Sequence, residues 1–117
     1  MDRWRVFKAT GTVEKVAPVV KAILRSKSEV ESLTVEHDDQ IILALTCPGL
    51  RSSFGERIRV ELSQSSEDVV ELQTSSESRE LFDLGLHKRN LHWIETGLSE
   101  EGLLIEAGPV KWQMRRG

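Results

Sequence analysis

The residues best suited to chemistry gather in one segment, residues 75–90, where hydroxyls, basic side chains, an aspartate and a histidine lie close together. Serine hydroxyls, arginine or lysine side chains and the amides at a helix start are groups that proteins use to hold a phosphate or carboxylate. The segment therefore predicts an anion or ligand site made of Ser76, Ser78, Arg79, Asp83, His87, Lys88 and Arg89. The same residue types also build turns and caps, with Gly85 allowing a tight backbone and Arg79 pairing with Asp83.

An enzyme is the alternative interpretation of this segment. Arg79 would hold an anionic substrate, and Asp83 or His87 would move a proton, since histidine titrates near neutral pH. However, His87 falls on the apolar stripe of an expected helix, where a hydrogen-bonded core histidine is the more common occupant. Catalysis requires a converging set of groups, and none can be assembled from the sequence. We therefore assign no catalytic residue and expect a non-catalytic binding or protein-interaction module.

Metal binding and thiol chemistry are not predicted. His87 and His92 are five residues apart, so on a helix they point about 140° away from each other and cannot share an ion. The sequence His37-Asp38-Asp39 is typical of a turn. The single cysteine, Cys47, excludes an internal disulfide, and we expect it to be buried and structural. No metal and no cofactor is expected.

Composition limits the class of protein. The 117 residues are 38% hydrophobic and 30% charged, which predicts one globular domain over 1–117, with a core of about 3–105. The net charge of −3 argues against a nucleic-acid binder. The longest apolar run, residues 41–45, is too short to span a bilayer, and no apolar signal core follows the first residues. We expect a cytoplasmic monomer or homodimer whose partner is a small molecule or a protein.

Hydrophobic spacing predicts a strand, a helix, four strands and a second helix. The first strand is expected around residues 4–9. The first helix begins either after Thr12 or near Ala17, because Pro18 is awkward inside a helix. The four strands are expected around 33–37, 40–46, 57–62 and 70–74. Leu84, Leu91 and Leu98 mark the second helix, which ends at Gly97 or Gly102. The tail, residues 106–117, has too little pattern to assign.

These elements predict an α+β fold with a single antiparallel, curved sheet of about five strands. Alternating charges at Arg57, Arg59 and Glu61 mark one wet face, where opposite charges are expected to pair across strands. For this reason the site is not expected on this face. Both helices should therefore cover the other face. Whether the sheet and the helices enclose a small apolar cavity or pack solid is left open.

Two tryptophans are candidate partner contacts, because tryptophan is enriched in binding hot spots. Trp93 is expected to pack under the sheet. Trp112 lies in the unassigned tail, where docking onto the domain and contact with a partner are equally plausible interpretations.

Two features of the chain resemble known proteins. The element order resembles a half-repeat of the TATA-box-binding protein and the helix-grip proteins, which hold lipids in a cavity. The segment around residues 76–89 resembles a bacterial domain family of unknown function that shows Ser-x-Ser-Arg, then Asp-x-Gly-x-Asn and a basic run. The matching residues are Ser76, Ser78, Arg79, Asp83, Gly85, Lys88 and Arg89, whereas His87 stands where that family has asparagine. The second resemblance implies a fold and a bacterial setting, but no reaction.

Overall fold

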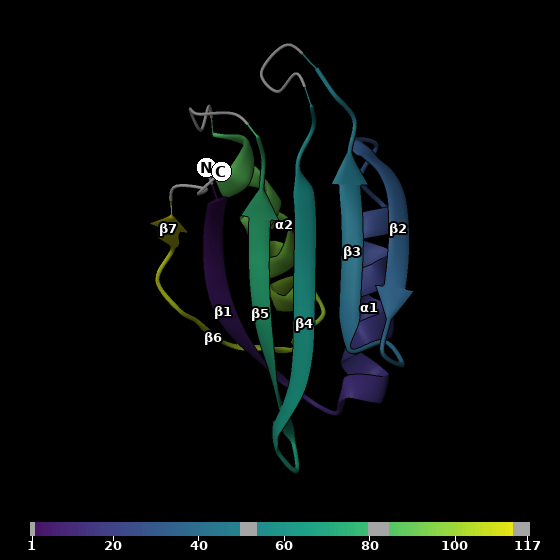
Figure 1. The fold of residues 1–117 in the computed structure, drawn as a ribbon. Helices are drawn as coiled ribbons and strands as arrows, with labels where there is room; N and C mark the ends of the chain where they lie inside the picture. Colours follow the sequence, from purple (N-terminus) through teal and green to yellow (C-terminus); the bar gives the residue numbers. More distant parts are fainter. Residues whose placement is uncertain (1, 50–53, 80–84, 114–117) are drawn as a thin grey trace.

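The computed structural model describes residues 2–49, 54–79 and 85–113 and shows a mixed α+β fold with two helices and one open antiparallel sheet (Figure 1). In chain order the elements are β1 (Asp2–Thr10), α1 (Val13–Arg25), β2 (Val30–Glu36), β3 (Ile41–Thr46), β4 (Arg57–Ser66), β5 (Val69–Glu77), α2 (Leu86–Glu100), β6 (Leu104–Ala107) and β7 (Lys111–Gln113).

The sheet has seven strands, so the prediction of about five was wrong. Its order is β2-β3-β4-β5-β1-β6, and β7 also pairs with β1. The two additional strands come from the C-terminal part of the chain, most of which has too little sequence pattern to assign. They are short strands that pair with β1, and between them the Gly108 N–H donates to the Val6 carbonyl at 2.8 Å. Strands of three or four residues show too few alternations to be recognised from hydrophobicity.

Both helices lie on the same face of the sheet, and the opposite face is uncovered (Figure 1). α1 packs against β2, β3 and β4, and α2 packs against β1, β5 and β6, while the two helices also contact each other. Alternate residues of the central strands face the helices and form one continuous apolar core, which includes Phe7, Val20, Leu24, Ile42, Ile58, Val60, Leu72, Ile94 and Leu98.

α1 begins at Val13 and contains Pro18 in its interior, which decides between the two starts that the sequence allowed. Proline removes one helical hydrogen bond. The helix nevertheless continues, because Val16, Ala17, Val20 and Leu24 are all buried on one side, and the proline itself is exposed. Thr12 makes no side-chain cap. Instead, the Val13 amide donates to Oε1 of Gln64 at 3.0 Å.

Neither described helix is long and apolar enough to cross a membrane.

Candidate functional site

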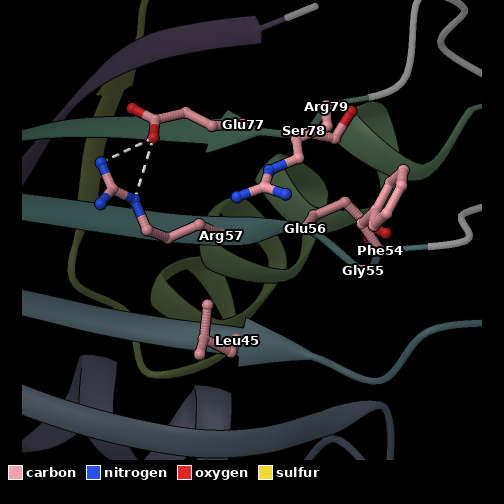
Figure 2. A pocket seen from close by; sticks show the side chains of 8 residues that line it. All are labelled: Leu45, Phe54, Gly55, Glu56, Arg57, Glu77, Ser78 and Arg79. Atoms are coloured by element: carbon pink, nitrogen blue, oxygen red, sulfur yellow. Dashed lines mark hydrogen bonds and ion pairs between the residues drawn. The ribbon is translucent and has the colours of Figure 1, made fainter.

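A pocket of about 310 Å³ lies at the end of the sheet where β3 and β5 finish and β4 begins. Leu45, Arg57 and Glu77 are direct neighbours across these three strands, so their side chains stand in one row on the uncovered face. Figure 2 shows this row, with the residues that complete the lining beyond the strand ends: Phe54, Gly55, Glu56, Ser78 and Arg79.

The lining is half apolar and half charged. Leu45 is 47% exposed and Phe54 is 62% exposed, so both side chains present apolar surface at the pocket. Arg57 is engaged with Glu77, whose Oε2 lies 2.7 Å from Nη2 and 2.9 Å from Nε (Figure 2). This is the cross-strand charge pairing that the sequence predicted for this face, whereas Arg59 pairs with Glu61 on its own strand at 3.0 Å.

Arg79 differs from the other arginines near this pocket, because its described contact is with an aromatic ring and not with a carboxylate. Its guanidinium lies 5.7 Å from the centre of the Phe54 ring, within the range of a cation–π contact. The residue is exposed, and it forms no ion pair with any residue that the structure describes. Figure 2 shows its side chain extending over the strand ends of β4 and β5.

The predicted site residues are divided between the two faces of the sheet. Successive side chains of a strand point in opposite directions. Glu77 therefore faces the open side, whereas Ser76 and Ser78 are buried and contact His87 on α2. Ser78 also lines the pocket, so of the predicted residues the pocket itself brings together Ser78 and Arg79.

The buried residues form a polar cluster between the sheet and the start of α2. Nδ1 of His87 lies 2.6 Å from Oγ of Ser76, and Nε2 lies 3.3 Å from Oγ of Ser78. Asn90, one turn along α2, donates to Ser76 at 3.1 Å and to Oε1 of Glu56 at 3.0 Å. His87 is thus a hydrogen-bonded core histidine, as its position on the apolar stripe predicted.

The charged groups at one end of this cluster fix the orientation of the Asn90 amide. Arg89 can only donate, and it does so to Oδ1 of Asn90 at 2.9 and 3.1 Å. Glu56 accepts from Nδ2 of Asn90, so both ends of that amide are assigned by its partners. Ser76 accepts the second Nδ2 hydrogen, and its hydroxyl can still either donate to Nδ1 of His87 or accept from it.

Both ring nitrogens of His87 are therefore within hydrogen-bonding distance of a serine hydroxyl, and a hydroxyl can serve as donor or acceptor in either tautomer of the ring. His87 is 2% exposed, so these contacts hold the ring inside the domain.

Glu56 and Arg89 form the ion pair that closes the cluster. Glu56 is only 3% exposed, and its Oε1 lies 3.2 Å from Nη2 of Arg89. Arg89 also stacks over Trp93, with 4.6 Å between the guanidinium carbon and the ring centre. Arg89 is therefore engaged within the domain. Lys88 is exposed on α2, and Asp83 lies outside the described residues.

Several residues of this region were not singled out from the sequence, among them Leu45, Phe54, Glu56 and Asn90. The signal available for Asn90 was its spacing of three from His87, which places two polar side chains on one helix face. Glu56 had no comparable signal, because its burial follows from how the segment before β4 approaches α2.

Cys47 is exposed, so the prediction of a buried cysteine was wrong. It follows the last residue of β3, Thr46, whose side chain is buried, and alternation therefore directs the next side chain outward. Its amide donates to the Glu29 carbonyl at 2.8 Å. Within residues 2–49, 54–79 and 85–113, no group of three or more histidine, cysteine or acidic side chains is arranged to hold a metal ion.

The two tryptophans differ in environment. Trp93 is partly buried against the core, as expected. Trp112 lies in β7, which pairs with β1, and its side chain is 61% exposed. The tail therefore docks through its backbone while this indole remains accessible to solvent.

The comparisons with known proteins do not assign this chain to a family. No family model matches the chain, and no curated protein shows significant sequence similarity to it, so the resemblance to a bacterial family stays a prediction. Among solved structures, the chain is similar to a conserved protein from Geobacillus kaustophilus, with 10% identity and a TM-score of 0.49 over 86% of this chain and 94% of that one. By its fold and its pocket, this protein is a two-layer α+β domain with a ligand-sized pocket at one end of its sheet.

Proposed function

We propose that this chain is a non-catalytic binding module that holds an anionic group of its ligand in the pocket beside Arg79. The proposal is supported by a difference in the contacts that the arginines of this region make. Arg57 is neutralised by Glu77 and Arg89 by Glu56, while Arg79 rests on an aromatic ring at the pocket. A guanidinium in this position offers paired N–H donors in the geometry that suits a carboxylate or phosphate.

The burial of His87 favours binding over catalysis. In the enzyme alternative, Asp83 or His87 would move a proton, and of these two residues only His87 lies within the described part of the chain. The His87 ring is 2% exposed, and both of its nitrogens lie within hydrogen-bonding distance of serine hydroxyls. This environment is typical of a structural histidine that is held by partners inside the domain.

The test is a titration of the ¹⁵N-labelled protein with sodium acetate at constant ionic strength, with chloride as the reference salt. We expect saturable shifts of the backbone amides of Gly55, Ser78 and Arg79, and we expect Arg79→Gln to abolish them. Arg59→Gln is the matched control, because Arg59 lies on the same sheet face but outside the pocket lining. Equal responses of the two variants, or no saturable response, would overturn the proposal.

A further inference from the structure

The composition of the pocket lining also indicates which class of anion it accepts. Its two carboxylates, Glu56 and Glu77, each have an arginine partner, so their charges are compensated. Among the described lining residues, Arg79 is then the single surplus positive charge. One uncompensated guanidinium matches a monoanion, whereas the second charge of a dianion would face two nearby carboxylates.

The other half of the lining is apolar. The exposed side chains of Leu45 and Phe54 belong to the same pocket as Arg79. Because the Arg79 guanidinium lies against the Phe54 ring, a ligand whose anionic end meets that guanidinium has an aromatic surface immediately beside it. Covering Leu45 and Phe54 would remove apolar area from water, which favours a ligand that carries a hydrophobic group next to its charge.

We propose that the pocket takes an apolar monocarboxylate, with the carboxylate at Arg79 and the hydrophobic group against Phe54 and Leu45. This inference rests on the proposed function and specifies its ligand class. A volume of about 310 Å³ lies at the lower end of the range for small-molecule sites and accommodates a short aliphatic chain or a single ring.

Four probes separate charge from hydrophobicity: acetate, hexanoate, hexanol and hexyl phosphate. Each is titrated into the ¹⁵N-labelled protein at neutral pH and constant ionic strength. We expect hexanoate to bind at least tenfold more tightly than acetate, because part of its chain is buried at about 0.8 kcal/mol per methylene group. Hexanol, which lacks the charge, and hexyl phosphate, which is largely a dianion, should each bind at least tenfold more weakly than hexanoate.

Two exposed positions provide the variants, so neither change threatens folding. Phe54→Ala should weaken hexanoate binding more than acetate binding, so that the ratio of the two affinities falls towards one. Arg79→Gln should weaken both, and Arg59→Gln should affect neither.

The outcomes distinguish this inference from the function on which it rests. Equal, Arg79-dependent affinities for acetate and hexanoate would overturn the apolar specificity and leave the anion site intact. Tighter binding of hexyl phosphate than of hexanoate would overturn the match to a monoanion. Absence of Arg79-dependent binding by all three anions would overturn the proposed function itself.

Discussion

Gly55 approaches the end of β3 so closely that a Cβ atom placed on it would overlap the carbonyl oxygen of Thr46. Its φ of +74° is also in the region that side-chain-bearing residues rarely adopt. The contact arises because Thr46 and Glu56 are tied together by backbone hydrogen bonding, with 2.9 Å from the Thr46 amide to the Glu56 carbonyl. Gly55 thus allows the chain to return beside β3 and to place Phe54 and Glu56 at the pocket.

Replacement of Gly55 by alanine should destabilise the protein by about 2 kcal/mol or more, because it combines left-handed backbone strain with a clash against main chain. Urea unfolding followed by circular dichroism measures the loss. Gly49→Ala is the control, since a Cβ at that position meets nothing within 4 Å and needs no positive φ. A Gly55→Ala protein as stable as the control would contradict the close approach.

Replacement of Asn90 by leucine keeps the branched shape of the side chain but removes the amide at the centre of the buried cluster. Glu56 would then lose one of its two donors, and Arg89 would lose the acceptor at 2.9 Å. Because the charged groups of Glu56 and Arg89 would each lose a hydrogen bond, the free energy of unfolding should fall by about 3 kcal/mol.

His92→Leu is the matched change at an exposed polar position of the same helix and should shift stability by about 0.5 kcal/mol or less. If the Asn90 variant were as stable as the His92 variant, the buried cluster would not contribute to stability in the way its geometry indicates.

The sequence predicted the elements of this fold better than it predicted the site. Core residues such as Ile42, Val60 and Leu91 lie where hydrophobic spacing placed them, because burial acts on every second strand residue or on one helix stripe. The site depends instead on which strands become neighbours. Leu45, Arg57 and Glu77 are far apart in the chain and share a row only through sheet register.

Proximity in sequence also misled the interpretation of residues 76–79. Ser76, Ser78 and Arg79 were expected to converge on one anion, yet the end of β5 turns Ser76 towards α2 and leaves Arg79 at the open face. Alternation along a strand could have anticipated this separation. The partners of Ser76, namely His87 and Asn90, could not have been derived without knowing where α2 packs.

Glu29 should make stability weakly dependent on pH in the acid range. A hydrogen bond from the backbone, aided by Ser28 and by the nearby Arg89, lowers the pKa of this carboxyl below its ordinary value. A lowered pKa in the folded state contributes stability above the unfolded-state pKa, and that contribution is lost as the pH falls through the folded-state pKa.

The variant Glu29→Gln should therefore be slightly less stable than the wild type at neutral pH, by about 0.5 kcal/mol or less because the side chain is largely solvated. The difference should vanish once the pH drops below the folded-state pKa. Thermal unfolding of both proteins across the acid range provides the measurement, and a difference that grew towards low pH would contradict the direction of the shift.

Gly97 marks the contact between the two helices. A Cβ on Gly97 would overlap the Ile23 side chain of α1, so Gly97→Ala should destabilise the domain by about 1–2 kcal/mol despite alanine's better helix propensity. In an Ile23→Ala background the same change should become neutral or stabilising, because the overlapping atoms are absent. A double-mutant cycle by urea unfolding tests this, and strict additivity of the two changes would contradict direct packing.

The place of β1 between β5 and the C-terminal strands has a consequence for how the protein is made. During synthesis, residues 2–10 emerge before all of their partners, since β5 spans residues 69–77 and the strands on the other side of β1 come later still. At about 5–20 residues per second, β1 waits several seconds for these partners. The hairpins formed by β2, β3, β4 and β5 pair locally and can assemble in the meantime. β1, although it precedes the other strands, is therefore among the last to be enclosed in the sheet.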